Sequence, residues 1–308
     1  MISKVALTAF ETRRTVIGGL RDLTATQRMQ RILELLETRD GVHVSELADE
    51  FSVSEVTVRH DLSELARQGL VARVRGGVRP LERGFSELAF DVRLRLQADE
   101  KRAIARAAAA MVGDGEAVAL DSSTTAYFVA RELRGRRELV VITNGLLNAS
   151  TLTESPGITV LVTGGMLRHP AMSVVGDLAA DMVRTTRIDK GFFGARGLSL
   201  DDGLMDLNPE EVRIKKEMAA ACTRVIGILD GTKWHRTALL PFVETDHVDA
   251  IVTDTGAPPE LVEAWRERGV EVIAERPRRQ RSPEHQPRLY RGLQALAAAR
   301  SEQERRDS

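Results

Sequence analysis

Hydrophobic positions between residues 24 and 65 repeat with the period of an α-helix in three successive segments. In residues 24–36 apolar side chains recur three or four positions apart, and Asp40-Gly41 ends the run. A shorter amphipathic segment covers residues 44–51, with Ser45 as a plausible N-cap. Only two residues separate it from the third segment. The pattern therefore predicts three short helices, of which the second and third meet at a steep angle.

The third predicted helix has one apolar face and a polar N-terminal end. Val58, Leu62 and Leu65 lie at i, i+4 and i+7, and either Ser52 or Ser54 can cap the first turn. An α-helix fits the major groove of B-form DNA, where short polar or cationic side chains touch phosphates and base edges. We expect such contacts from Ser54, Val56, Thr57, Arg59 and His60.

Residues 70–79 alternate apolar side chains with arginines after Gly69 ends the third helix. This alternation predicts a thin hairpin with a cationic outer face. A helix that enters a groove and a hairpin that lies along the backbone hold DNA in two places. We expect Arg73, Arg75 and Gly76 to take part.

The pattern changes beyond residue 98, where short, continuously apolar runs alternate with helical segments. Such an alternation is typical of an α/β fold, a doubly wound and mostly parallel sheet with helices on both faces. The predicted helices are 124–134, 145–153, 177–186, 209–222 and 259–268. The predicted strands are 117–120, 139–143, 158–163, 191–194, 224–229, 250–253 and 270–273.

The chain has 308 residues, of which 43% are apolar, enough for about two globular domains. We expect a mobile leader in residues 1–23, a winged helix-turn-helix domain in 24–80 and a linker in 81–97. An α/β effector domain would follow in 98–275, and a disordered, arginine-rich tail in 276–308.

Charge and cysteine content limit the classes of protein to which the chain can belong. The 44 Lys and Arg nearly balance the 45 Asp and Glu, but arginines exceed acids around the third helix and the hairpin. No apolar run has the length of a membrane span and no signal peptide opens the chain, which predicts a cytoplasmic protein. The single cysteine, Cys222, lies in a predicted helical run and is expected to pack, not to react.

Polar residues follow the predicted strands, at the edge where ligands bind in doubly wound sheets. Asp121 is followed by four hydroxyl residues, Ser122 to Thr125, which suit either an anion site or a helix cap. Later strand ends carry Asn144, Gly165 with Arg168, Gly194, and Lys233. Each signal is weak by itself because turns are rich in such residues, but five successive ones favour a binding site.

Residues 27–77 resemble the winged helix-turn-helix of the DeoR family of bacterial transcription regulators. The match rests on Val-Ser-x-x-Thr-hydrophobic-Arg-x-Asp-Leu at 53–62 and on Arg-x-x-Gly-Gly at 73–77. The family usually has Arg at His60 and His at Arg75. Both positions stay polar or cationic, so the resemblance implies DNA binding without implying an operator sequence.

The segment from Asp91 to Glu275 resembles the effector domain of the same family, which is similar in fold to ribose-5-phosphate isomerase and glucosamine-6-phosphate deaminase. In that family the hydroxyl loop holds the phosphate of a sugar phosphate, and nearby loops and lysines hold the sugar. Ser123 stands where the family usually has glycine. The implied effector residues are Asp121, Ser122, Ser123, Thr124, Thr125, Asn144, Gly165, Arg168, Gly194, Lys215 and Lys233.

A regulator is favoured over an enzyme because the isomerases carry acids directly after the Gly-Ala pair, whereas this chain has Arg196-Gly197. The acids that follow, among them Asp206 and Glu211, have the spacing of a loop and a charged helix start. We expect a repressor that needs no cofactor or metal, binds operator DNA as a homodimer or higher oligomer, and is released by a phosphorylated sugar. The alternatives are a sugar-phosphate isomerase or deaminase with an accessory DNA-binding domain, and a protein-interaction module.

Overall fold

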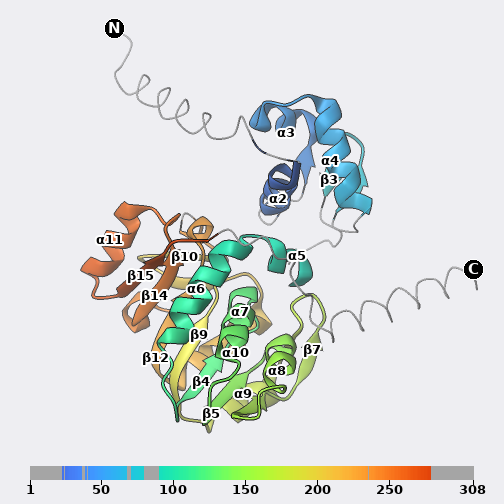
Figure 1. The fold of residues 1–308 in the computed structure, drawn as a ribbon. Coiled ribbons are helices and arrows are strands. Elements are labelled where there is room, and N and C mark those ends of the chain that lie inside the picture. The colour runs from blue at the N-terminus through green and yellow to red at the C-terminus, as the bar shows by residue number, and fades with distance from the viewer. Residues whose placement is uncertain are drawn as a thin grey trace, which may run out of the picture. The chain divides into compact units, whose positions relative to one another are not determined.

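The computed structural model describes residues 23–278, except 24, 37–38, 40, 68–70, 80–89 and 235. The chain forms two compact units, Met1–Leu88 and Ala89–Ser308 (Figure 1). Nearly all of the predicted leader and tail lies outside the described residues. Every helix that the structure describes is too short or too polar to traverse a lipid bilayer.

The first unit is a winged helix-turn-helix, as predicted. Its helices are α2 (Ala25–Leu36), α3 (Val44–Phe51) and α4 (Glu55–Arg67). The strands β1 (Val42–His43), β2 (Ala72–Val74) and β3 (Gly77–Arg79) form an antiparallel sheet in the order β1-β3-β2. Val58, Leu62 and Leu65 are buried, which confirms the predicted apolar face of the third helix.

The caps of the first unit confirm one expectation and correct another. Ser54 Oγ accepts a hydrogen bond from the Thr57 backbone N–H at 3.1 Å, so Ser54 caps α4. Ser52 instead ends α3 in the left-handed conformation, with φ of 54°. The expectation for Ser45 is wrong because α3 begins at Val44 with His43 as its N-cap, so Ser45 lies within the first turn. There the Glu46 carboxylate accepts from the His43 N–H at 3.2 Å and holds the first turn.

The second unit is built on a seven-stranded parallel sheet in the order β15-β14-β12-β9-β4-β5-β6. All seven predicted strands are present, with ends shifted by at most a few residues. Cys222, predicted within a helix, instead opens β12. The strands are β4 (Ala117–Leu120), β5 (Leu139–Thr143), β6 (Ile158–Val162), β9 (Ile188–Phe193), β12 (Cys222–Ile228), β14 (Ala250–Asp254) and β15 (Glu271–Glu275).

Helices cover both faces of this sheet, as a doubly wound fold requires (Figure 1). Successive strand residues alternate between two cores: Phe192 packs with α6 (Ala98–Ala110), α7 (Thr124–Leu133) and α8 (Leu146–Leu152). Phe193 packs on the opposite face. The helices there are α9 (Asp177–Arg184), α10 (Pro209–Ala220) and α11 (Pro259–Glu267).

Three features of the second unit were not predicted. The hairpin of β7 (Met166–Arg168) and β8 (Ser173–Val175) follows β6. A small antiparallel sheet joins β10 (Gly197–Ser199), β11 (Gly203–Asp206) and β13 (Leu240–Val243). Helix α5 (Phe90–Arg95) lies inside the predicted linker, and its Phe90 and Leu94 are buried in the second unit's core. The linker predicted for 81–97 is therefore too long at its C-terminal end.

Candidate functional site

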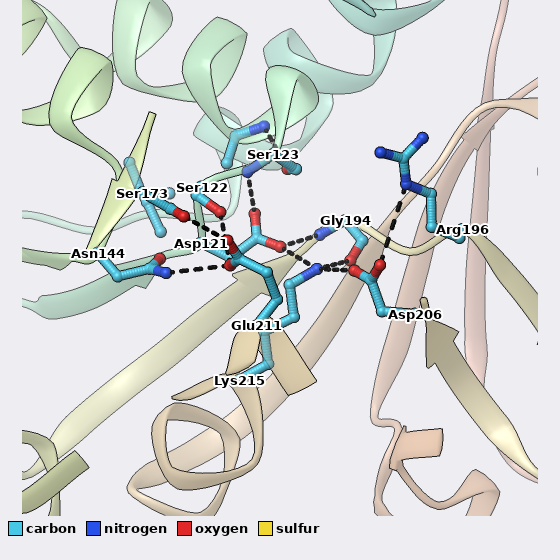
Figure 2. Close-up of polar contacts among 12 residues, drawn as sticks. Asp121, Ser122, Ser123, Asn144, Ser173, Gly194, Arg196, Asp206, Glu211 and Lys215 are labelled. Atoms are coloured by element: carbon cyan, nitrogen blue, oxygen red, sulfur yellow. Dashed lines mark hydrogen bonds and ion pairs between the residues drawn. The ribbon is translucent and has the colours of Figure 1, made fainter. Parts of the chain in front are cut away.

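Three neighbouring strands of the large sheet end at one place. Because β9, β4 and β5 are adjacent and parallel, the residues after them meet at the same edge. Asp121 follows β4, Asn144 follows β5 and Gly194 follows β9. Figure 2 shows these residues around a cluster of polar contacts, to which α10 adds Glu211 and Lys215.

Asp121 connects the loops of this edge. Its Oδ1 accepts from the Ser123 N–H at 3.0 Å, and its Oδ2 accepts from the Gly194 N–H at 2.9 Å. The Lys215 ammonium lies 3.0 Å from Asp121 Oδ2, and donates to Asp206 Oδ2 at 2.6 Å and to the Gly194 carbonyl at 2.8 Å. One buried lysine thus joins the ends of β4, β9 and β11.

Lys215, Asp121 and Asp206 stabilise one another in their charged forms. Burial alone lowers the pKa of Lys215, but the carboxylates of Asp121 and Asp206 outweigh burial and raise that pKa above its ordinary value. Burial likewise raises the pKa of Asp206, yet Lys215 and then Arg196 bring it below its ordinary value. Lys215 is therefore a permanent cation at neutral pH and holds Asp206 as an anion.

Glu211 is the second centre of the cluster. Its side chain is buried, and donors from four different segments converge on its carboxylate: Ser122 Oγ at 3.1 Å, Asn144 Nδ2 at 3.5 Å, Arg168 NH1 at 2.6 Å, and the Ser173 hydroxyl. A carboxylate with four donors is well satisfied despite its burial. It fixes the hairpin β7–β8 against the ends of β4 and β5.

Local sequence explains how Glu211 and Lys215 are presented. Asn208 Oδ1 accepts from the backbone N–H groups of Glu210 and Glu211 at 3.0 and 3.2 Å, and Pro209 occupies the first position of α10. Glu211 and Lys215 then lie at i and i+4, on one face of the helix. Both the cap and the proline agree with the predicted start of this helix.

Of the two roles considered for the hydroxyl loop, the structure shows the helix cap. Ser123 Oγ accepts from the Ala126 N–H at 3.1 Å and is the N-cap of α7. Thr124 and Thr125 are buried in the first turn, where N–H groups lack acceptors within the helix. A Cβ on Gly194 would lie 2.4 Å from the Ser123 Cβ, so a side chain at position 194 is excluded.

The remaining predicted residues fall into two groups. Arg168 joins the cluster through Glu211, whereas Gly165, with φ of +128°, forms the turn before β7, where a Cβ would lie 2.2 Å from the Val175 carbonyl oxygen. Lys233 lies on the 3-10 turn η1 (Gly231–Lys233) after β12, which β9 separates from β4. The lysine that contacts Asp121 is Lys215.

Sequence reasoning missed several members of the cluster. Glu211 and Asp206 were assigned to a charged helix start and a loop, but their carboxylates accept the cluster's main hydrogen bonds. Asn148 donates to the Asp121 carbonyl at 2.7 Å and to Thr143 Oγ1 at 3.2 Å. The i, i+4 spacing of Glu211 and Lys215 after a strong cap was the one local signal for this pair.

One acceptor at the cluster is left open. Within the part of the chain that the structure describes, Asn144 Oδ1 is buried and accepts no hydrogen bond. A buried amide oxygen is normally satisfied, so this atom suits a donor such as a hydroxyl group. No group of three or more metal-ligating side chains was found among the described residues.

The first unit exposes most of the residues that were predicted to contact DNA. Val56, Arg59 and His60 are exposed on α4, and Arg73, Arg75 and Gly76 are exposed on the wing, the hairpin of β2 and β3. Arg59 pairs with Glu55 at 2.7 Å, and Arg73 NH1 lies 3.4 Å from the Arg59 carbonyl oxygen. Behind this surface the buried ion pair of Arg28 and Asp61, at 2.7 Å, fixes α2 against α4.

Comparisons with known proteins cover both units. Residues 28–83 match the model of the DeoR-like helix-turn-helix domain, and residues 96–255 match that of the DeoR C terminal sensor domain. The chain is 32% identical over 262 residues to a putative aga operon transcriptional repressor of Escherichia coli O157:H7, covering 84% of this chain and 97% of that protein. It is 31% identical over 247 residues to the glycerol-3-phosphate regulon repressor of Escherichia coli K12, covering 80% of this chain and 98% of that protein.

Among solved structures, ribose 5-phosphate isomerase A of Methanocaldococcus jannaschii matches with a TM-score of 0.34 and 17% identity, over 45% of this chain and 55% of that one. The two domain models together extend over most of the described residues, and the two bacterial repressors are matched over nearly their whole length. The chain belongs to the DeoR family of DNA-binding transcription regulators.

Proposed function

We propose that the protein represses a carbohydrate-metabolism operon and is released from its operator by a phosphorylated sugar. The observation that carries this proposal is the buried polar cluster around Glu211 and Lys215, which lies at the ligand-binding edge of a parallel sheet. Two relatives are named as repressors of the aga operon and of the glycerol-3-phosphate regulon, which supports a carbohydrate-linked signal.

The chemistry of the edge fits a sugar phosphate. Thr124 and Thr125 place hydroxyls and N–H groups at the start of α7, where the helix dipole favours a phosphate. The open Asn144 Oδ1 accepts from a sugar hydroxyl. The carboxylates of Glu211 and Asp121 give further acceptors if the ligand replaces their present donors.

A regulator is favoured over an isomerase by the state of the charged groups. Aldose-ketose isomerisation needs a carboxylate that takes up a proton from the substrate. Here Asp206 is held as an anion by Lys215 and Arg196, with its pKa lowered, and the Glu211 carboxylate accepts from four donors. These groups are arranged for hydrogen bonding and charge balance, which suits binding.

The regulatory step is a shift between two populations. The ligand-free protein presents reading helices from two copies to paired operator half-sites. The sugar phosphate binds more tightly to a form in which those helices no longer match the half-sites, so DNA dissociates.

A thermal-shift screen of the intact protein tests this function. Each sugar phosphate is compared with its unphosphorylated sugar and with inorganic phosphate. A ligand at about 100 times its Kd should raise the unfolding midpoint of the second unit by roughly 5 °C or more. The same compound should then dissociate operator DNA in a mobility-shift assay. The proposal is contradicted if no phosphorylated compound of the panel both raises the unfolding midpoint and dissociates operator DNA.

A further inference from the structure

A second buried polar atom with an open hydrogen-bonding position lies beside Asn144. Thr163 follows β6 and is 2% exposed, and its hydroxyl has no hydrogen-bond partner among the described residues. Asn144 follows β5 and is also buried, and its Oδ1 likewise accepts from no described residue. Buried polar atoms are normally hydrogen-bonded, so two open atoms at neighbouring strand ends point to a common partner.

The register of the sheet places the two residues side by side. Strands β5 and β6 are parallel, with Thr143 paired to Val162. The Thr163 N–H donates to the Thr143 carbonyl at 3.1 Å, so the ladder continues by one residue and brings Thr163 next to Asn144. Neighbouring strands lie about 4.8 Å apart, and a single small group can therefore contact both side chains.

Both side chains belong to the face of the sheet that carries Glu211. Thr143 points to the other face, where its Oγ1 lies 3.2 Å from Asn148 Nδ2 of α8. Because side chains alternate along a strand, Asn144 points to the α10 face, and its Nδ2 donates to Glu211 Oε2 at 3.5 Å (Figure 2). Residues in register share a face, which places Thr163 on the same side.

The contact with Glu211 fixes which way the Asn144 amide points. The Glu211 carboxylate, paired with Arg168 at 2.6 Å, accepts hydrogen bonds, so the amide nitrogen faces it and the amide oxygen is turned away. Oδ1 therefore offers an acceptor, whereas the Thr163 hydroxyl offers both a donor and an acceptor. A ligand hydroxyl suits both atoms at once, since it can donate to Asn144 and accept from Thr163.

Two other buried threonines show the usual arrangement. Thr143 Oγ1 donates to the Leu120 carbonyl at 2.6 Å, and Thr253 Oγ1 accepts from Trp234 Nε1 at 2.9 Å. Within the described residues Thr163 makes no such contact, although valine would fill the same space without a polar atom to desolvate. Its hydroxyl therefore destabilises the ligand-free fold and becomes favourable when a ligand bonds to it.

We propose that Thr163 and Asn144 form a hydroxyl-selective subsite of the effector site. The ligand presents a hydroxyl that donates to Asn144 Oδ1 and accepts from the Thr163 hydroxyl. The inference rests on the proposed function for the phosphate and adds the residue that selects the sugar. A compound with hydrogen at that position leaves both atoms open and binds more weakly.

The order of the strands decides which hydroxyl is read. The phosphate lies at the start of α7, which follows β4, whereas the subsite lies at the ends of β5 and β6. These ends are one and two strand spacings away, about 5–10 Å. The subsite therefore selects a hydroxyl at the end of the sugar remote from its phosphate.

The hairpin β7–β8 controls access to the subsite. The Val174 N–H donates to the Asn144 carbonyl at 2.7 Å, so β8 lies against the end of β5. The preceding residue on this strand, Ser173, donates to Glu211. A ligand that replaces the Ser173 hydroxyl therefore loosens the strand beside Asn144 and opens the way to Thr163.

The unfolding midpoint of the ligand-free protein gives the first test. Thr163→Val removes a hydroxyl without a partner, so the midpoint should stay within about 1 °C of native or rise. Thr253→Val is the matched control, because it removes the acceptor of Trp234 on a strand remote from β5, and it should lower the midpoint by roughly 3 °C or more. A comparable loss in Thr163→Val would mean that its hydroxyl supports the fold, and would overturn the proposal.

Calorimetric titration of the full chain gives the second test. The probes are ribose 5-phosphate, glucose 6-phosphate, fructose 6-phosphate and glycerol 3-phosphate, each compared with its unphosphorylated form and with inorganic phosphate. A probe that binds the native protein should bind Thr163→Val about 10-fold or more weakly. Thr163→Ser should restore the affinity to within about threefold, and Thr253→Val should leave it native.

Deoxy analogues of the bound probe identify the hydroxyl that is read. One monodeoxy form should bind the native protein as weakly as the parent compound binds Thr163→Val, and the variant should weaken that form no further. If Thr163→Val weakens every monodeoxy form as much as it weakens the parent, the pairing of Thr163 with a ligand hydroxyl is wrong.

The outcomes separate this inference from the proposed function. A phosphorylated probe with equal affinity for the native protein and for Thr163→Val would retain the effector and reject the subsite. A free sugar or polyol that binds as tightly as its phosphate ester, and loses affinity in Thr163→Val, would retain the subsite and reject the phosphate. Absence of binding by every probe would overturn both.

Discussion

The DNA-reading surface of the first unit and the polar cluster of the second unit treat electric charge in opposite ways. The first exposes its arginines on α4 and the wing, where their contacts are local, as between Arg59 and Glu55. The second buries Asp121 in contact with Lys215, and buries Glu211 in contact with donors from several loops. An exposed charge is well hydrated and free to meet a phosphate, whereas a buried charge is stable only with its partners in place.

This difference separates recognition from sensing. DNA presents a regular array of phosphates, so the first unit needs a shaped cationic surface on a small core. A small ligand must compete with contacts already made inside the protein, and in the proposed function it takes over donors of Glu211 and Asp121. Mutations should therefore affect stability strongly in the second unit and affinity mainly in the first.

The largest effect is expected from removal of the buried cation. Lys215→Met leaves Asp121 and Asp206 buried without their partner and should destabilise the second unit by about 3–5 kcal/mol. Urea unfolding measures this. Lys216→Met is the matched control, since Lys216 is the next residue and is exposed, and it should change the free energy of unfolding by less than about 0.5 kcal/mol. Equal effects of the two variants would mean that the buried lysine contributes no more to stability than an exposed one.

Removal of an exposed arginine on the reading helix should leave stability almost unchanged but weaken operator binding. Arg59→Ala is expected to lose about 1–3 kcal/mol of binding free energy while the response to sugar phosphates stays native. Fluorescence anisotropy at several salt concentrations measures the loss, and Arg137→Ala, an exposed arginine of the second unit, serves as control. Native operator affinity in Arg59→Ala would mean that α4 does not hold DNA through this residue.

Loss of a hydroxyl at the start of α7 should affect the signal alone. Thr124→Ala is expected to reduce the binding free energy of the effector by about 1–2 kcal/mol, while the affinity for the operator stays native. Lys233→Ala, at the end of β12, is compared with it because Lys233 was predicted as an effector residue. Titration of operator release with the sugar phosphate distinguishes the two, and a native release curve for either variant would exclude that residue from the effector site.

The smallest effect concerns a partly buried acid outside the cluster. Burial, and to a lesser extent Asp254 and Asp230, raise the pKa of Glu100 above its ordinary value, so the folded state binds its proton more tightly than the unfolded state. The ionised side chain therefore destabilises the fold above that raised pKa, and the effect disappears in acid. Glu100→Gln should raise the unfolding midpoint by about 1–2 °C at pH 7 and leave it unchanged near pH 4, as calorimetry would show.

Local signals explain which parts of the fold could be predicted. The start of α10 was predictable because Asn208, Pro209 and the acids after them act within one turn. The central strands of the large sheet were predictable because helices cover both of its faces and each strand contains a short run of apolar residues. Strands of three residues, such as β7 and β10, leave too short a pattern.

The candidate site could be predicted only in part, for the same reason. Asp121 and Asn144 follow predicted strands, so the topology alone brings them together. Glu211 was assigned to a charged helix start because its local sequence is that of an ordinary first turn. Its four donors come from segments 38 to 89 residues away, and no local pattern records such contacts.

The exposed valine of α4 should affect how operator binding depends on temperature. Val56 is 76% exposed on the first turn of α4, among side chains that are otherwise polar. In a major groove its methyl groups can meet the C5-methyl of a thymine, and water leaves both surfaces. Burial of apolar area lowers the heat capacity on binding. The share of the operator affinity that Val56 contributes should therefore vary with temperature and resist salt, whereas the share expected from Arg59 and the wing arginines should fall as salt rises.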